Sequence, residues 1–156
     1  MTDAFRVRPA SPADVPAIGQ LVELAYGHYV PRIGERPAPM DEDYGEVVRL
    51  GHTWVAEEAG ALIGVLVLVP GSDHLLIENV AVAPGSWGRG VGRRLLELAE
   101  GRAREAGLAE LRLYTNALMT ENRAYYARRG YRETGRQTVD GFDRVYFAKP
   151  AQPNAG

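Results

Sequence analysis

The chain contains no cysteine. This absence excludes disulfide bonds, thiolate metal ligands and a cysteine nucleophile. It also fits a reducing compartment, so we expect a cytoplasmic protein. The first residues, MTDAFRVRP, lack the apolar core of a secretory signal. No apolar run approaches the roughly 20 residues that span a bilayer, so we expect no membrane partner.

Lysine is scarce, since Lys149 is the only one among the 18 basic residues. The formal net charge of −2 gives no general attraction to nucleic acid, so no nucleic-acid partner is expected. The three histidines have no metal-ligand spacing, and we expect no metal. With 156 residues, the chain is long enough for one domain with a real core, placed at 1–149. A flexible tail is expected at 150–156.

Hydrophobic periodicity and turn residues predict the order β-α-α-β-β-β-α-β-α-β-β. Strands are expected at 5–8, 53–58, 61–69, 75–83, 111–115, 131–137 and 142–148. Helices are expected after a cap at Ser11, within 41–50, at 90–106, and from 120 or 121 to just before Gly130. The proline-rich stretch 30–39 is expected to be an irregular loop. This order predicts an α/β (α+β) fold in which helices flank a mixed sheet.

The most informative segment is 75–98, LLIENVAVAPGSWGRGVGRRLLEL. A buried strand leads through Gly88, Gly90 and Gly92 into an amphipathic helix. Glycines at a helix start let a ligand approach backbone N–H groups that have no partner within the helix. The helix dipole makes that end positive, so this segment predicts a phosphate or pyrophosphate site.

Three kinds of glycine-rich binding site could explain this segment. A Walker A loop requires lysine after its second glycine, and the chain has no lysine there. A dinucleotide fingerprint requires a third glycine where Arg93 stands, and the strand at 111–115 does not end in an acid. That hypothesis is weakened but stays open. The third possibility is a site for acyl-coenzyme A.

Two motifs support the third possibility. VAVAPGSWGRGVGRRLL, followed by LYTNALMTENRAYYARRGYRE, resembles the GNAT acetyltransferase superfamily. The first segment is similar to the family's pyrophosphate loop, although Trp87 stands where the pattern prefers glutamine or arginine. The second is similar to its Asn-x-x-Ala…Tyr-x-x-x-Gly-Tyr/Phe signature through Asn122, Tyr126, Gly130 and Tyr131.

The resemblance implies a mixed, mostly antiparallel seven-stranded sheet flanked by about four helices, with a V-shaped splay between strands 4 and 5. It also implies acetyl-CoA as cosubstrate, with pantetheine along the strand before the loop and pyrophosphate at the loop. The expected cofactor-binding residues are Val80, Ala81, Val82, Trp87, Gly88, Arg89, Gly90, Val91, Gly92, Arg93, Asn116, Asn122 and Tyr126. For Arg94 we expect a solvated helix face.

The implied reaction is direct attack of a primary amine on the thioester in a ternary complex. Tyr126 matches the family's general acid, and its neighbour Tyr125 is expected to be the core residue. The N–H of Val80 is expected to stabilise the oxyanion. Glu78 is the best candidate for general base, because it is the only acid between Asp73 and Glu97 and lies in an apolar strand. An ion-paired or solvent-facing Glu78 is the open alternative.

The resemblance places the acceptor near the first two helices, where Tyr26, Tyr29, Met40 and Tyr44 are expected to line a pocket. The expected function is therefore transfer of an acetyl group from acetyl-CoA to a primary amine of a small molecule. A protein or peptide amine acceptor and a non-catalytic acyl-CoA sensor remain alternatives. The sequence leaves open the acceptor, the acyl chain, and whether the protein is a monomer or a homodimer.

Overall fold

A computed structural model of the chain describes residues 5–151, and its strands form one seven-stranded sheet in the order β1-β2-β3-β4-β5-β7-β6. The strands are β1 (Arg6–Pro9), β2 (Thr53–Glu58), β3 (Ala61–Pro70), β4 (His74–Val82), β5 (Glu110–Asn116), β6 (Arg132–Val139) and β7 (Phe142–Pro150). β4 and β5 pair in parallel, whereas β1–β2, β2–β3, β5–β7 and β6–β7 are antiparallel. The predicted mixed sheet and its fold class are confirmed.

The helices of the described residues are α1 (Val15–Tyr26), α2 (Val30–Ile33), α3 (Tyr44–Arg49), α4 (Val91–Glu105) and α5 (Thr120–Arg128). Four of these exceed one turn, in agreement with the expectation. Short 3-10 turns lie at Pro12–Asp14, Gly27–Tyr29, Ala38–Asp41 and Pro84–Ser86.

The stretch 30–39 differs from the expected irregular loop, because it begins with the helical turn α2. Pro31 lies in the first turn of α2, where a missing N–H costs no helical hydrogen bond. Gly34 ends this turn in the left-handed conformation, with φ of 85°. α3 starts at Tyr44, later than expected, because the Asp43 carboxylate caps it by accepting the N–H of Glu46.

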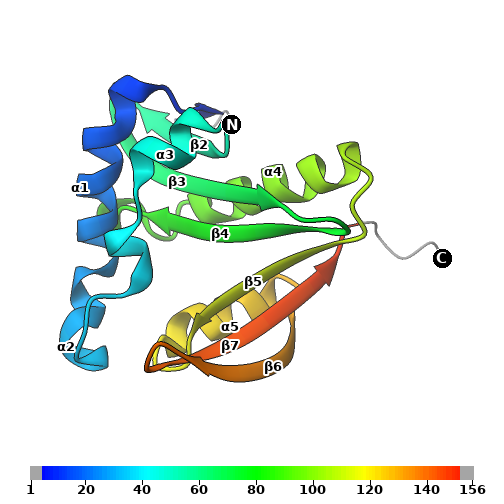
Figure 1. Ribbon diagram of the computed structural model, residues 1–156. Coiled ribbons are helices and arrows are strands. Elements are labelled where there is room, and N and C mark those ends of the chain that lie inside the picture. The colour runs from blue at the N-terminus through cyan, green and yellow to red at the C-terminus, as the bar shows by residue number, and fades with distance from the viewer. Residues whose placement is uncertain (1–4, 152–156) are drawn as a thin grey trace. The chain divides into compact units, whose positions relative to one another are not determined.

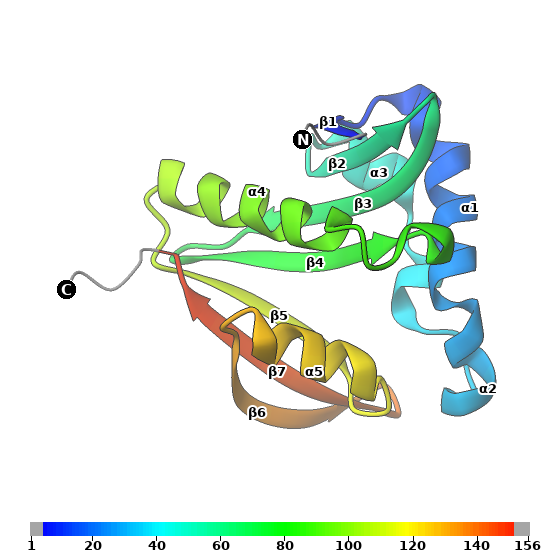
Figure 2. The ribbon, with the colours of Figure 1, turned by 180° about the vertical axis from the view of Figure 1, so that it is seen from behind.

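The contacts of the chain gather in two compact units. The first contains the chain up to Leu68 together with Asn79–Leu98, so it holds β1, β2, most of β3, the end of β4 and the start of α4. Within it, α3 and the start of α4 lie on opposite faces of the β2–β3 hairpin (Figures 1 and 2). The hairpin turns at Ala59 and Gly60, as predicted, and both have positive φ.

Gly64 on β3 fixes the approach of α4 to the hairpin. A Cβ added there would lie 2.9 Å from Cγ1 of Val91 and 3.1 Å from Cδ1 of Leu95. Both of these helical side chains are fully buried. Glycine therefore lets the first turns of α4 rest directly on the strand.

The second unit contains Val69–Glu78 and the chain from Ala99 onward. Here α5 lies on one face of the β5–β7–β6 sheet (Figures 1 and 2). The rings of Tyr126 on α5 and Phe147 on β7 meet at 6.1 Å between centroids. The turn between β6 and β7 is at Asp140 and Gly141, as predicted.

Lys149, the single lysine, closes the end of α5 in this unit. Its Nζ donates a 2.8 Å hydrogen bond to the backbone oxygen of Arg129 and lies 3.2 Å from Oε1 of Glu100. A cation at a helix C-terminus is favoured by the dipole. Two residues later, Ala151 is buried, and its N–H donates to the oxygen of Ala109. The expected tail at 150–156 thus begins with ordered residues, and its remainder, 152–156, lies outside the described residues.

Candidate active site

Two left-handed glycines join the end of β4 to the start of α4. After the 3-10 turn at Pro84–Ser86, Trp87 is extended, and Gly88 and Gly90 then have φ of 80° and 86°. Side chains other than glycine are strained in this conformation. α4 begins at Val91 and runs for 15 residues. Its free N–H groups and the positive end of its dipole therefore lie at this turn.

Gly92 is the second residue of α4, so its N–H is among those without a helical partner. Val91 is 1% exposed and anchors the start of the helix. The loop thus has the backbone form that an anion site requires.

Trp87 is 55% exposed and folds back onto the strand that precedes it. Its indole N–H donates a 2.9 Å hydrogen bond to the backbone oxygen of Val82. Its ring and that of His28 form a T-shaped pair, with centroids 5.8 Å apart. Val82 is one of the residues expected to bind pantetheine through its backbone, so the indole occupies an acceptor on that strand.

The two arginines expected at the pyrophosphate each pair with a glutamate. Nη1 of Arg89 lies 3.0 Å from Oε1 of Glu58, and this hydrogen bond holds the pKa of Glu58 below its usual value. Nε of Arg93 lies 3.1 Å from Glu97, one helical turn away. The Arg93–Glu97 pair is exposed, and the side chains of the Arg89–Glu58 pair are 38% and 28% exposed. Ion pairs in contact with solvent contribute little free energy, so an anion can compete for either guanidinium.

A buried hydrogen-bonded chain ties β4 to the helices of the first unit. The Tyr26 hydroxyl donates to Oδ1 of Asn79 at 2.6 Å and, at 3.3 Å, to the oxygen of Val80. Nδ2 of Asn79 donates to the Tyr44 hydroxyl at 2.9 Å, and that hydroxyl donates to the oxygen of Pro39. Burial raises the pKa of Tyr26 well above its usual value, so it stays a donor.

Tyr26 and Tyr44, two of the expected acceptor residues, are thus buried and bonded within the protein. Tyr29 is also buried, and its ring packs on His28 and beneath Arg32. Met40 is half-buried. The part of these four side chains in acceptor binding remains a prediction.

Glu78, the expected base, is half-buried on β4. Successive side chains alternate along a strand, so Glu78 shares a face with Leu76 and His74. Its neighbours on the other face, Ile77 and Asn79, are buried. This alternation agrees with the predicted strand and presents the carboxylate on the less buried face of β4.

Tyr126, the expected acid, is 8% exposed on α5. Its ring lies edge-on to Tyr131 at 5.9 Å and to Tyr125 at 5.8 Å. The expectation that Tyr125 is the core residue is wrong, because Tyr125 is only half-buried and carries the Arg129 guanidinium 5.0 Å above its ring. α5 turns the side chain of Tyr126 inward because Phe147 fills the sheet face beneath it.

Asn116 and Asn122 flank the turn between β5 and α5. Oδ1 of Asn116 accepts the N–H of Leu118 at 2.9 Å, which shapes the chain as it leaves the strand. Nδ2 of Asn122 lies 3.6 Å from the sulfur of Met119. Both amides therefore shape this turn, and their predicted contacts with pantetheine remain a prediction.

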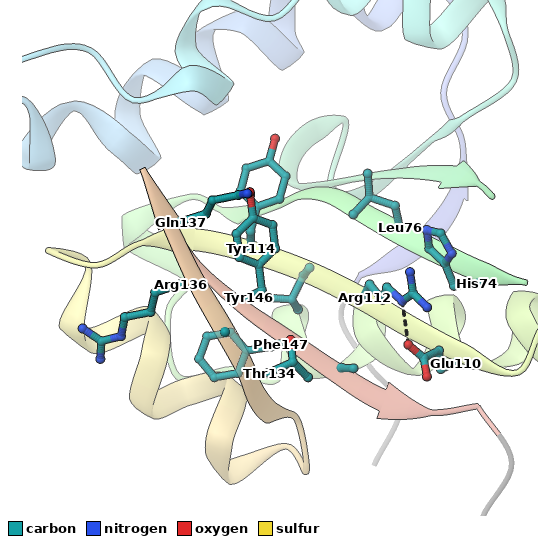
Figure 3. Close-up of a pocket in the computed structure, with 13 residues that line it drawn as sticks. His74, Leu76, Glu110, Arg112, Tyr114, Thr134, Arg136, Gln137, Tyr146 and Phe147 are labelled. Atoms are coloured by element: carbon teal, nitrogen blue, oxygen red, sulfur yellow. Dashed lines mark hydrogen bonds and ion pairs between the residues drawn. The ribbon is translucent and has the colours of Figure 1, made fainter. Parts of the chain in front are cut away.

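A cavity of about 670 Å³ opens in the second unit (Figure 3). It is lined by β4, β5, β6 and β7, through His74, Leu76, Glu110, Arg112, Leu113, Tyr114, Thr134, Gly135, Arg136, Gln137, Tyr146, Phe147 and Ala148. In Figure 3, Tyr114, Tyr146 and Gln137 gather at one end, and Arg112, Glu110 and His74 lie toward the other. The size suits a small molecule.

Across residues 5–151, no group of three or more histidine, aspartate or glutamate side chains is arranged to hold a metal ion. In the same range, no helix is both long and apolar enough to span a membrane.

Comparison with known proteins identifies the family. The model of the acetyltransferase (GNAT) family matches residues 18–131, which is more than half of the chain. The chain belongs to the GNAT family. This confirms the resemblance drawn from the glycine loop and the segment around Tyr126.

Among GNAT proteins, N-acetyltransferase family 8 member 3 of Rattus norvegicus is 30% identical over 88 residues. The match covers 53% of this chain and 39% of the relative, so the chain corresponds to less than half of that protein.

Solved GNAT structures share the fold. A PaiA N-acetyltransferase from Thermoplasma acidophilum, in complex with coenzyme A, has a TM-score of 0.80 and 17% identity, covering 96% of this chain and 99% of that one. A GNAT acetyltransferase from Elizabethkingia anophelis with acetyl-CoA bound has a TM-score of 0.72 and 21% identity, over 96% of this chain and 99% of its own.

Two features of this GNAT chain were not identified from its sequence. Asn79 is a polar residue inside an apolar strand, and that exception was a signal of the tyrosine network. The cavity wall comes from Tyr114 and Tyr146, which stand on different strands. Alternation assigns each residue to one face of its own strand, but only the pairing of β5 with β7 brings the two rings together.

Proposed function

We propose that this protein is an N-acetyltransferase that transfers an acetyl group from acetyl-CoA to a primary amine of a small molecule. The observation that carries the proposal is the turn at Gly88 and Gly90, left-handed at both glycines and followed at once by the 15-residue α4. Backbone N–H groups at such a turn suit the pyrophosphate of coenzyme A. The solved GNAT structures with coenzyme A or acetyl-CoA support this choice.

The end of β4 is proposed to bind the pantetheine arm through the backbone of Val80, Ala81 and Val82. Val80 and Val82 are half-buried, whereas Ala81, on the opposite face, is buried. The Val80 N–H is proposed to donate to the oxyanion that forms when the amine attacks the thioester carbon. Asn116 and Asn122 are proposed to bind pantetheine amides.

Glu78 is proposed to take a proton from the acceptor ammonium, directly or through water. The free amine then forms the new C–N bond, and the C–S bond breaks to release coenzyme A as a thiolate. No covalent acyl-enzyme is required for this direct transfer.

Tyr126 is proposed to donate a hydrogen bond to the sulfur as charge develops on it. The unperturbed pKa is about 10 for tyrosine and about 8.5 for a thiol, so complete proton transfer is uphill by about 2 kcal/mol. Hydrogen bonding therefore describes the role of Tyr126 better than proton donation.

The experiment combines calorimetry of coenzyme A with thiol release from acetyl-CoA over a panel of small amines. We expect binding of coenzyme A and thiol release with at least one amine. In Tyr126→Phe, we expect kcat to fall about tenfold or more while the affinity for coenzyme A is kept. Binding without turnover, with no effect of Tyr126→Phe, indicates an acyl-CoA sensor. The absence of both coenzyme A binding and turnover would overturn the proposal.

A further inference from the structure

The cavity in the second unit has an aromatic wall built by two paired strands. Tyr114 on β5 and Tyr146 on β7 are direct partners in the register, with ring centroids 5.7 Å apart. The Tyr146 hydroxyl lies 3.3 Å from Oε1 of Gln137 on β6. The alternate residues of β7, Val145 and Phe147, are buried on the α5 side. The two tyrosine rings therefore offer a surface on which a planar apolar group can pack.

Ion pairs neutralise most of the charges around this wall. Arg112 donates to Glu110 at 2.6 Å, and Arg136 donates to Glu133 at 3.0 Å. In Figure 3, Arg136 also extends away from the other labelled side chains.

Arg144 differs from these arginines. Arg144 is not one of the lining residues, but its guanidinium lies 4.3 Å from the centroid of the ring of Tyr114, which does line the cavity. Within residues 5–151 it has no carboxylate partner. Arg144 shares its face of β7 with Tyr146, because the two are separated by one residue. A guanidinium stacked on an aromatic ring keeps its edge free for a carboxylate, which it binds through two parallel hydrogen bonds. A single uncompensated cation suits a monoanion better than a phosphate.

We propose that this cavity holds the acceptor of the acetyl group, and that the acceptor is an aromatic primary amine that also carries a carboxylate. This inference rests on the proposed acetyltransferase function. The ring packs on Tyr114 and Tyr146, and the carboxylate binds Arg144. Glu78 lies on the same face of β4 as Leu76, which lines the cavity, and supplies the negative charge that an ammonium group requires.

The experiment compares three acceptors in the thiol-release assay. L-Phenylalanine has the ring and the carboxylate, phenethylamine lacks the carboxylate, and L-alanine lacks the ring. We expect kcat/KM for phenylalanine to exceed that for each of the others by about tenfold or more. In Arg144→Gln, we expect the value for phenylalanine to fall about tenfold further than the value for phenethylamine.

Arg128→Gln is the matched control, because Arg128 is an exposed residue of α5. We expect it to leave the order of the three acceptors unchanged. Tyr146→Leu provides a second test, since it should lower kcat/KM for phenethylamine more than for alanine. Equal use of the three acceptors, or equal losses in Arg144→Gln, overturns the inference.

The two proposals fail in different ways. If other amines are acetylated with no preference for phenylalanine, the proposed acceptor class is wrong and the proposed acetyltransferase function stands. Absence of both coenzyme A binding and turnover removes the proposed function. In that case, calorimetry of phenylalanine with the wild type and with Arg144→Gln still tests the cavity. If phenylalanine binds the wild type but not Arg144→Gln, the proposed recognition of its carboxylate by Arg144 is supported. If phenylalanine does not bind the wild type, or binds both proteins equally, that recognition is overturned.

Discussion

The hydroxyl of Tyr26 and the side-chain oxygen of Asn79 are 2.6 Å apart, although 53 residues separate them in the chain. Both side chains are buried. Asn79→Ala removes the acceptor of Tyr26 and the donor to Tyr44 together. We expect unfolding to become about 1–3 kcal/mol more favourable, because buried polar groups lose partners. Urea denaturation measures the change.

A double-mutant cycle with Tyr26→Phe isolates this contact. We expect the loss in the double variant to be smaller than the sum of the two single losses, since both remove one hydrogen bond. Strict additivity would show that the contact contributes nothing in solution.

Gly90→Ala tests the glycine turn. Its φ of 86° strains alanine although a Cβ there would meet open space, so the expected damage is to the path of the backbone. We expect the dissociation constant of coenzyme A, measured by calorimetry, to rise about tenfold or more. Gly60→Ala is the matched control, with φ of 82° in the β2–β3 turn. It should cost similar stability and leave the dissociation constant unchanged, and an equal loss of affinity would contradict the assignment.

Trp87→Phe tests whether the indole competes with a ligand for the Val82 oxygen. Phenylalanine keeps an aromatic ring but removes the N–H that donates at 2.9 Å. If the pantetheine arm needs this oxygen, we expect coenzyme A to bind up to about tenfold more tightly, as one intramolecular hydrogen bond no longer has to break. In a Trp54→Phe background, Trp87 is the only tryptophan, and its emission should change on binding. Unchanged affinity and unchanged emission would show that Trp87 stands apart from the ligand.

We predict that the substitution Asp14→Asn lowers stability by an amount that depends on pH. Two hydrogen bonds from Arg8, at 2.8 and 3.0 Å, hold the pKa of Asp14 well below its usual value. Because the pKa of Asp14 is lower in the folded state, its carboxylate contributes its full stabilisation above the pKa of the unfolded chain, near 4. That stabilisation is lost progressively as the pH falls from there toward the folded pKa. We expect a loss of about 1–2 kcal/mol at pH 7 in urea denaturation.

The difference in unfolding free energy between the wild type and Asp14→Asn should become smaller as the pH falls below 4. Glu46→Gln is the control, because its partner Arg49 lies three residues away on an exposed helix surface. That variant should change stability little at either pH. A gap for Asp14→Asn that stays constant from pH 7 to pH 3 would count against the ion pair.

The fold could be predicted from the sequence wherever a local signal decided the structure. The β2–β3 hairpin follows from Ala59-Gly60 between two apolar runs, and its predicted first strand has the observed bounds, Thr53–Glu58. The glycine turn was predicted because Gly88 and Gly90 stand between an apolar strand and an amphipathic helix, and both have the left-handed φ that favours glycine. The segment around Tyr126 was recognised through its spacing to Gly130.

The rest depends on contacts between distant residues. The expectation that Tyr125 rather than Tyr126 is the core ring was wrong, because the contact with Phe147 beneath α5 decides which ring turns inward. Asn79 shows its role only beside Tyr26 and Tyr44. Arg89 forms its ion pair with Glu58, which lies 31 residues earlier on the β2–β3 hairpin.

The single lysine affects how acetylation of this protein would be read. Lys149 holds the only side-chain amine of the chain, and that amine is bonded to the end of α5 and to Glu100. To react with a thioester it must leave both partners and lose its proton. Background labelling of side chains by acetyl-CoA should therefore be slow and confined to one site. Intact mass then separates modification of the protein from acetyl groups delivered to an added amine.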